Sequence, residues 1–149
     1  MSYTIYTDGS CLKNPGAGGW AAIIVDESTG EKTEIHGGEK STTNNRMEMT
    51  AAIASLSLTS EGDEINLFTD SQYLKKAFTE NWIVNWKRRN WQTASKSPVK
   101  NVDLWKTLDE LVSNRKVKFK WVQGHAGDQF NERCDELARN EASRFKNSR

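Results

Sequence analysis

The first third of the chain alternates apolar and polar residues in short runs, a pattern typical of β-strands with one buried face. Residues 2–8 alternate regularly, residues 19–27 form a nearly continuous apolar run, and residues 31–39 are more polar, as expected of an edge strand. Turn residues at 27–30 join the last two runs closely. Because short connections favour antiparallel pairing, we expect a three-stranded antiparallel unit.

A helical pattern follows these strands. Residues 42–58 begin with Thr and Asn, which favour helix N-termini, and continue with Ala, Leu, Ile and Met. The remaining chain is predicted to contain a strand, a short helix capped by Asp70 or Ser71, another helix, a strand and a final helix, at 64–70, 71–79, 102–113, 117–122 and 128–146. A strand–helix–strand step makes the first and fourth strands parallel neighbours through a right-handed crossover. The predicted fold class is therefore α/β: a five-stranded mixed sheet, three strands antiparallel and then two parallel, with helices on both faces.

Composition places the chain among soluble globular proteins. It has 149 residues, of which 36% are hydrophobic and 28% charged, and we expect a single domain over 1–149. No apolar run approaches the roughly 18 residues of a membrane helix, and the N-terminus lacks the order of segments in an export signal. Two cysteines, Cys11 and Cys134, suit a reducing compartment. We therefore expect a cytoplasmic protein without a membrane partner.

The net charge of +1 conceals a separation of charge along the chain. Residues 87–120 contain ten Lys or Arg and three acids, whereas the rest contains 11 bases and 17 acids. This separation favours a polyanion bound at the basic segment and a cation bound elsewhere. The alternative is a solvated basic face that binds nothing.

Four acids are candidates for the cation site. Asp8 and Asp70 each end a strand with the same Thr-Asp pair, so parallel pairing places both at one sheet edge. Glu48 begins a seam of small residues that lets its helix approach the sheet closely: Ala51, Ala52 and Ser55. Asp135 lies at the rim of the apolar stripe of the last helix.

Each acid also has a local interpretation. Asp8 could be a turn residue and Asp70 a helix N-cap. Glu48 could form a capping box with Asn45, and Asp135 an ion pair with Arg139. Four carboxylates gathered at one point would repel one another and raise each other's pKa. Hard divalent cations such as Mg²⁺ accept oxygen ligands, and two such ions can stabilise the attacking and leaving oxygens of a phosphodiester displacement.

Six sequence stretches carry a resemblance to a known family: YTDGSCLKNPGAGGW, TTNNRMEM, TDSQY, WIVNWKRRNW, SPVKNVDLW and WVQGHAGDQFNERCDELA. Through them the chain resembles bacterial type I ribonuclease H over nearly its whole length. The resemblance implies the ribonuclease H-like fold and endonucleolytic hydrolysis of the RNA strand of RNA–DNA hybrids, leaving a 5′-phosphate. It also implies a monomer that uses Mg²⁺, with two ions in the substrate complex and Mn²⁺ as a substitute.

The resemblance assigns roles to individual residues. The metal-binding acids are Asp8, Glu48, Asp70 and Asp135, and His125, in a loop between Gly124 and Gly127, assists proton transfer or product release. Contacts to RNA are implied for Cys11, Asn14, Asn44, Asn45 and Gln72. The alternative roles are turn and cap residues, and for Cys11 a small packed side chain. The basic protrusion that holds the DNA strand is implied to use Trp82, Lys87, Arg88 and Arg89, and a DNA-phosphate pocket is implied to use Thr43 and Asn101.

Two points of this assignment stay open. Many relatives carry Arg two residues before the threonine of the phosphate pocket, whereas this chain has Ser41 beside Lys40. Either the pocket is weaker or Lys40 supplies the charge. Two or three of the tryptophans in the basic segment are expected to pack against the body rather than contact substrate: Trp82, Trp86, Trp91 and Trp105.

Two rival functions share part of this pattern. A strand-transfer nuclease of the same superfamily would share the acids but would not need the Asn and Gln set. A non-enzymatic hybrid-binding module would keep the basic segment but would not need the acids and a loop histidine.

Overall fold

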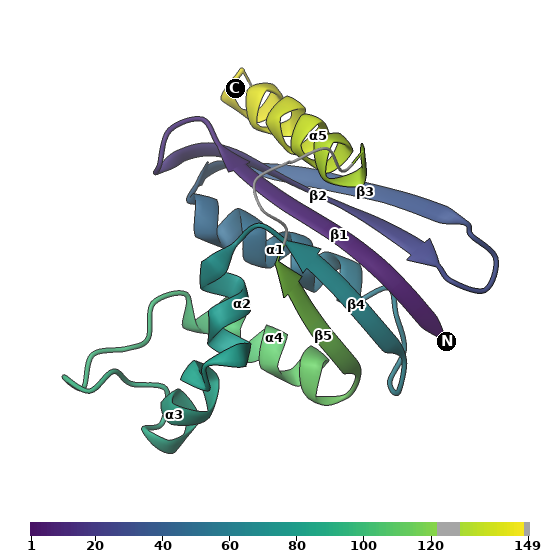
Figure 1. Cartoon of the computed structure of the whole chain (residues 1–149). Helices are drawn as coiled ribbons and strands as arrows, with labels where there is room; N and C mark the ends of the chain where they lie inside the picture. The colour runs from purple at the N-terminus through teal and green to yellow at the C-terminus, as the bar shows by residue number, and fades with distance from the viewer. Residues whose placement is uncertain (122–128, 148–149) are drawn as a thin grey trace.

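The sheet is built around β1 (Ser2–Cys11), which has a partner on each side. Its antiparallel neighbour is β2 (Gly16–Asp26), which pairs antiparallel with β3 (Lys32–Thr42). Its parallel neighbour is β4 (Glu64–Thr69), followed by β5 (Lys116–Trp121), also parallel. The order β3-β2-β1-β4-β5 confirms the predicted mixed sheet (Figure 1). This computed structural model describes residues 1–121 and 129–147.

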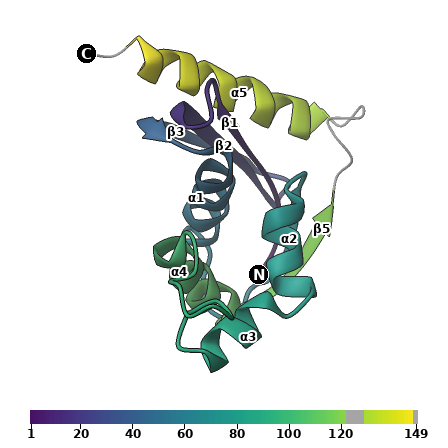
Figure 2. The ribbon, with the colours of Figure 1, turned by 90° about the vertical axis from the view of Figure 1, so that its left-hand side faces the viewer.

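Helices cover both faces of the sheet. In chain order they are α1 (Asn44–Leu56), α2 (Gln72–Thr79), α3 (Trp82–Arg88), α4 (Val102–Ser113) and α5 (Gln129–Lys146). Helix α5 packs on β1, β2 and β3, and α1 packs on β1 and β2 from the opposite side (Figure 2). Only α3 was not predicted as a separate helix. Within the described residues, none of the helices combines the length and hydrophobicity needed to cross a membrane.

Two apolar clusters hold these layers together. The larger joins the sheet to α1, α2 and α4 and contains Ile5, Leu67, Met49 and the fully buried Trp105. The smaller lies under α5 and includes Ala21, Ile23, Cys134, Leu137 and Ala138. Burial of one large aliphatic side chain contributes roughly 1.5–3 kcal/mol, so the two clusters fix the helices that carry the acids.

Close contact between α5 and the sheet depends on glycine. A Cβ added at Gly19 would lie 2.1 Å from the carbonyl oxygen of Ala138, which no side chain tolerates. On the other face, the predicted seam of Ala51, Ala52 and Ser55 is fully buried. Small residues therefore bring a helix close to each side of the central strands.

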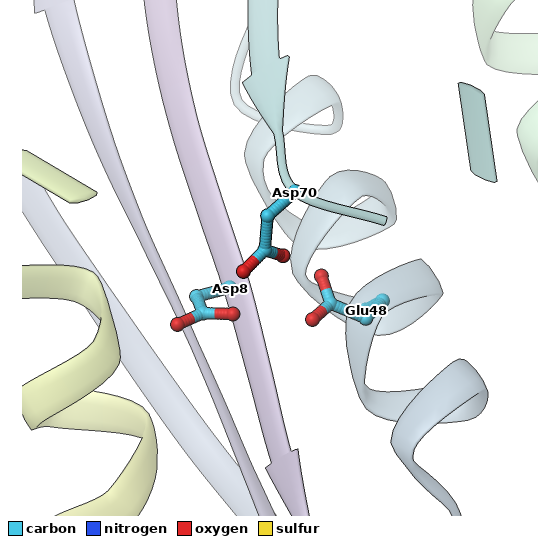
Figure 3. Close-up of side chains that lie close together, drawn as sticks. All are labelled: Asp8, Glu48 and Asp70. Carbon is cyan, nitrogen blue, oxygen red and sulfur yellow. The ribbon is translucent and has the colours of Figure 1, made fainter. Parts of the chain in front are cut away.

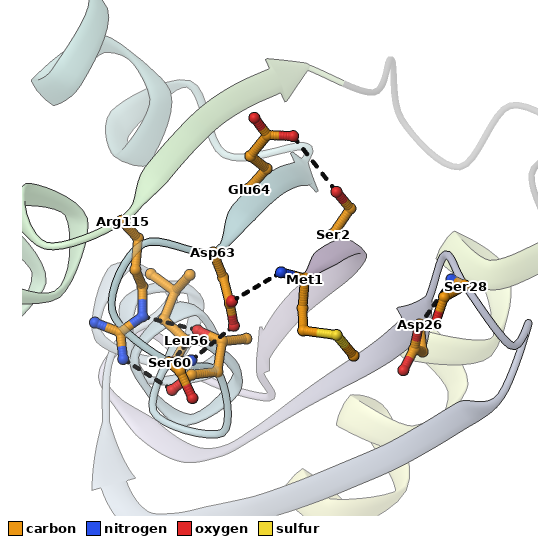
Figure 4. A network of polar contacts seen from close by, with 10 residues as sticks. Met1, Ser2, Asp26, Ser28, Leu56, Ser60, Asp63, Glu64 and Arg115 are labelled. Atoms are coloured by element: carbon orange, nitrogen blue, oxygen red, sulfur yellow. Dashed lines mark hydrogen bonds and ion pairs between the residues drawn. The ribbon is translucent and has the colours of Figure 1, made fainter.

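Polar contacts fix the end of the sheet at which the chain begins (Figure 4). The N-terminal ammonium group lies 3.3 Å from Asp63 Oδ1, and the backbone N–H of Ser60 donates to Asp63 Oδ2 at 2.8 Å. The hydrogen bond from Ser60 holds the pKa of Asp63 below its ordinary value. Arg115 donates to the carbonyl oxygen of Thr59 at 2.9 Å. These contacts tie the α1–β4 connection to β1 and to the start of β5.

Candidate metal centre and nucleic-acid surface

Three carboxylates from three elements converge at the centre of the molecule. Asp8 lies within β1, Asp70 directly follows β4, and Glu48 lies in α1. The parallel pairing of Tyr6 with Phe68 brings the first two side by side. One oxygen from each of Asp8, Glu48 and Asp70 lies within 4.8 Å of the others (Figure 3). The predicted convergence of these acids is therefore confirmed, although the turn interpretation of Asp8 is wrong because β1 continues to Cys11.

Gly9 allows this convergence. Its backbone N–H lies 2.9 Å from Asp8 Oδ1 and 3.0 Å from Glu48 Oε1, and donates to both. A Cβ at this position would lie 2.5 Å from the backbone nitrogen of Glu48. Gly9 was not singled out from the sequence, where the Asp-Gly pair was read as a possible turn, but here it is the point at which α1 meets β1.

The N-termini of α1 and α2 are capped by other residues and not by the acids. The N-cap of α1 is Thr43, whose side chain accepts from the backbone N–H of Arg46 at 3.2 Å. The N-cap of α2 is Ser71, which accepts from the backbone N–H of Leu74 at 3.1 Å. The capping-box interpretation of Glu48 and the N-cap interpretation of Asp70 are therefore wrong, and both carboxylates face the cluster.

The electrostatics of the cluster favour a bound cation. Asp8 and Glu48 are 3% and 8% exposed. Burial, followed by the charges of Asp8 and Asp70, raises the pKa of Glu48 well above its ordinary value. Glu48 Oε2 is buried and accepts no hydrogen bond from the residues described. A divalent cation would satisfy this oxygen and offset the repulsion, so the donor set fits an oxygen-ligated metal ion.

Asp135 joins the site from the opposite face of the sheet. It lines an open pocket of about 390 Å³ together with Asp8, Glu48 and Asp70. Arg139 Nε donates to Asp135 Oδ2 at 2.9 Å, as the local interpretation predicted. Asp135 therefore takes part in the ion pair and lines the acidic pocket, but it lies outside the three-oxygen cluster found among the described residues.

The candidates for RNA contact surround the same acids, with one exception. Cys11, Asn44, Asn45 and Gln72 line the acidic pocket. Asn14 instead lines a second pocket and accepts, through Oδ1, from the backbone N–H of Asn44 at 3.3 Å. The Cys11 thiol lies 2.8 Å from the carbonyl oxygen of Lys13, so it is held by the β1–β2 turn.

The second pocket, of about 200 Å³, contains both candidates for DNA-phosphate contact. Its lining includes Thr43, Asn101 and Lys100. The described lining includes neither Lys40 nor Ser41. Sequence reasoning gave Lys100 no place in this pocket, although its position beside Asn101 in the basic segment was the available signal. Among the described residues that line this pocket, Lys100 is the basic one.

The basic segment projects from the body as α3 and the loop after it (Figure 1). Lys87, Arg88 and Arg89 are all exposed, and Lys87 Nζ lies 3.1 Å from Asp109 Oδ2 of α4. Trp82 packs within an aromatic cluster, 6.1 Å from the ring centres of Tyr73 and Trp86. Trp105 belongs to the larger core cluster, and Trp82, Trp86 and Trp91 pack against it. All four tryptophans therefore pack against the body, whereas two or three were expected to do so.

Comparison with known proteins decides the family. A family model described as RNase H matches residues 1–143. The chain belongs to the RNase H family. Curated relatives include Ribonuclease H of Maricaulis maris, 56% identical over 137 residues, with 91% of this chain and 90% of the relative covered. Ribonuclease H of Pseudomonas savastanoi pv. phaseolicola is 54% identical over 137 residues, covering 92% and 90% of the two chains.

Solved RNase H structures share the fold. LC9-RNase H1, a type 1 RNase H with the type 2 active-site motif, superposes with a TM-score of 0.83 at 28% identity, covering 97% of this chain and 73% of that one. LC11-RNase H1 in complex with RNA/DNA hybrid has a TM-score of 0.67 at 22% identity, with 95% and 97% covered. The second likeness shows the RNase H fold alone.

One predicted RNase H residue cannot be placed. His125 lies outside the described residues, so its assigned role rests on the sequence motif.

Proposed function

We propose that this chain is an endonuclease that hydrolyses the RNA strand of RNA–DNA hybrids and leaves a 5′-phosphate on the RNA products. Family membership and the identity to ribonucleases H over most of the chain support this activity. The observation that carries the proposal is the convergence of Asp8, Glu48 and Asp70 within 4.8 Å. A structural relative bound to RNA/DNA hybrid is consistent with the same substrate class.

The acids would hold the metal. Asp8, Glu48, Asp70 and Asp135 line one pocket and supply carboxylate oxygens that suit Mg²⁺. Two ions, with Mn²⁺ as a possible substitute, would supply the positive charge that stabilises the attacking and leaving oxygens. Gly9 orients two of the carboxylates through its N–H. His125 would move a proton or help to release product.

The pocket walls would recognise RNA. RNA differs from DNA at its 2′-hydroxyl, which lies in a wide and shallow minor groove. Amide side chains can donate to and accept from this hydroxyl. Asn44, Asn45 and Gln72 stand beside the acids and suit this task, whereas Asn14 is better placed to support the Asn44 backbone. Cys11 would contribute packing rather than catalysis, since its sequence motif places no general base beside it.

The DNA strand would be held away from the metal centre. Thr43, Lys100 and Asn101 form a polar pocket with one cation, which suits a single phosphate. Arg46 Nη1 donates to Asn101 Oδ1 at 3.3 Å and so orients the amide in this pocket. Arg88 and Arg89 of the protrusion would contact further phosphates, with Lys87 and the Trp82 ring at its base.

Other expectations remain predictions: a single domain, a monomer and a cytoplasmic location. The rival functions are separated from the proposed one by a substrate panel. The protein would be incubated in Mg²⁺ with end-labelled RNA–DNA hybrid, single-stranded RNA and duplex DNA. We expect cleavage of the hybrid RNA alone, with 5′-phosphate ends. Joining or nicking of duplex DNA would favour a strand-transfer nuclease, and hybrid binding without cleavage would favour a binding module.

A further inference from the structure

A row of exposed lysines follows one face of β5. Side chains alternate along a strand, and Lys116, Lys118 and Lys120 are exposed while Val117 and Phe119 pack against the larger core cluster. Successive lysines of the row lie roughly 6.6 Å apart along the strand, from a rise of about 3.3 Å per residue. We call these three residues the β5 lysine row.

The row faces the side of the sheet that carries α5, at a place that this helix does not cover. Lys120 pairs in register with Phe68, whose ring stacks on Tyr6 with 5.1 Å between centroids, and Tyr6 packs against the cluster under α5. Helix α5 itself packs on β1, β2 and β3, and the two views show it displaced from β4 and β5 (Figures 1 and 2). A pocket of about 190 Å³ at this place has Lys116 and Lys118 in its lining, together with Glu64 and Asn66.

The positive charge of the row is not neutralised by described neighbours. No lysine of the row forms an ion pair with a described residue. Two acids lie toward the far end of this face, and each is engaged by a hydroxyl of β1: Ser2 donates to Glu64 at 3.4 Å, and Thr4 donates to Glu27. Glu64, whose contact with Ser2 is drawn in Figure 4, pairs in register with Lys116. Lys118 and Lys120, which pair in register with Asn66 and Phe68, therefore form the end of the row that has no acid in register.

This end of the row lies next to the metal centre. Trp121, which follows Lys120, pairs in register with Thr69, and Asp70 comes directly after Thr69. Phe68 is only partly buried and lies beside Lys120. A row of cations beside a partly exposed aromatic ring combines two elements of single-strand binding surfaces, which use cations along the backbone and rings on which bases stack.

We propose that the β5 lysine row binds the phosphates of a single-stranded nucleic acid that extends from the hybrid beyond the metal centre. Charge complementarity selects a polyanion, and a single row of cations matches one backbone rather than two. The proposal rests on the proposed function only in placing the hybrid at the metal centre. Single-stranded extensions would then strengthen binding without entering the acidic pocket.

The test compares blunt hybrid with the same hybrid carrying a single-stranded DNA extension at either end. Binding is measured in Mg²⁺ over a range of salt, with Asp70→Asn as the background so that substrate is not cleaved. We expect the extension at one end to tighten binding. Lys116→Ala/Lys118→Ala/Lys120→Ala should abolish that gain and make the salt slope for the extended hybrid shallower by up to roughly 2.1, from about 0.7 per single-strand phosphate contact.

A matched variant removes the same charge elsewhere. Lys76, Lys106 and Lys146 are exposed on α2, α4 and α5, and their combined change to Ala should leave the gain from the extension intact. The proposal is overturned if the lysine variant loses the same affinity for blunt and extended hybrids, or if neither extension tightens binding. It is also overturned if the row binds an acidic polyglutamate peptide but no single-stranded nucleic acid. Cleavage of blunt hybrid, measured with Asp70 intact, separates the two proposals. If the protein cleaves no hybrid either with or without the lysine changes, the result counts against the nuclease function and not against the lysine row.

Discussion

Glu48 combines two properties that rarely occur together in a carboxylate. It is buried, and it lies against two other acids. Both properties raise its pKa, with burial as the larger cause. Without metal, the native state therefore holds a proton on Glu48 more tightly than the unfolded chain does, and ionisation of Glu48 destabilises the fold.

Glu48→Gln should therefore stabilise the metal-free protein at neutral pH. Because the folded pKa lies above the unfolded value, the stability contributed by protonated Glu48 is complete below about pH 4.5 and is lost as pH rises through the folded pKa. The advantage of the Gln variant should thus be largest at neutral pH and vanish toward pH 4.5. Each unit of pKa difference corresponds to about 1.4 kcal/mol of unfolding free energy.

Urea unfolding in EDTA at several pH values measures this advantage. Glu141→Gln is the matched control, because Glu141 is also 8% exposed but accepts from Arg144 at 2.9 Å and lies 3.1 Å from His36 Nδ1. The control should lose stability at neutral pH. A Glu48→Gln variant that behaves like the control would contradict the account of an unsatisfied buried carboxylate.

At the level of single residues, much of the site was predictable from sequence. Parallel pairing of the two strands that carry the Thr-Asp pairs, together with helical spacing, sufficed to bring Asp8, Glu48 and Asp70 together, although β1 does not end at Asp8 as predicted. Sequence pattern did not decide between capping and metal binding, because that choice depends on which neighbouring hydroxyl reaches the helix N-terminus. The structure gives that role to Thr43 and Ser71. Lys100 was missed because its place depends on how the loop before α4 closes against the β1–β2 turn.

Helix α3 presents cations whose surroundings differ. Lys87 is held by Asp109, whereas no described residue forms an ion pair with Arg88 or Arg89. Phosphate contact by Lys87 would require breaking an existing ion pair. The two arginines should therefore contribute more to hybrid binding than the lysine does.

Arg88→Ala/Arg89→Ala should raise KM for hybrid with little change in kcat, because the contact is the same in bound substrate and transition state. The salt slope of log affinity should become shallower by up to roughly 1.8, taking about 0.9 per phosphate from duplex DNA. Lys87→Ala is the control, and it should change the salt slope by less than the roughly 0.9 expected for one arginine–phosphate contact. Parallel salt plots for all variants would identify α3 as a solvated face, and a fall in kcat alone would place it at the chemical step.

The sequence predicted most elements but not α3, for a physical reason. This helix has only seven residues, and its N-cap, Asn81, adopts a left-handed conformation with φ of 61°. Its tryptophans resemble a binding surface in sequence, yet they pack because Trp105 and Tyr73 offer aromatic partners. Such partners come from segments distant in the chain, so local pattern cannot reveal them.

The whole molecule brings together acids from four elements on both sides of one sheet. Because a bound ion would offset their repulsion, Mg²⁺ should raise the melting temperature relative to EDTA at equal ionic strength. Binding to the native state contributes about 2.7 kcal/mol when the ion is present at 100 times its Kd. The fold should persist in EDTA while cleavage vanishes. Asp8→Asn should reduce the Mg²⁺-dependent rise, and a melting temperature insensitive to Mg²⁺ would argue against a preformed metal site.

His125 should matter less than the acids. His125→Ala should lower turnover roughly 10²-fold, the low end for general acid–base assistance. Single-turnover cleavage of hybrid measures this loss beside that of an acid variant. Equal losses in the two would contradict the separate roles assigned to proton transfer and metal binding.

The central claim is that the clustered carboxylates hold the metal that cleaves hybrid RNA. Asp70→Asn tests it most directly, because the change keeps the shape of the side chain but removes its charge and one metal-ligand oxygen. Cleavage and binding of the same labelled hybrid would be measured across a Mg²⁺ titration for both proteins. We predict near-complete loss of turnover in the variant with hybrid affinity nearly unchanged. Turnover close to that of the unaltered protein at the same Mg²⁺ concentration would contradict the account.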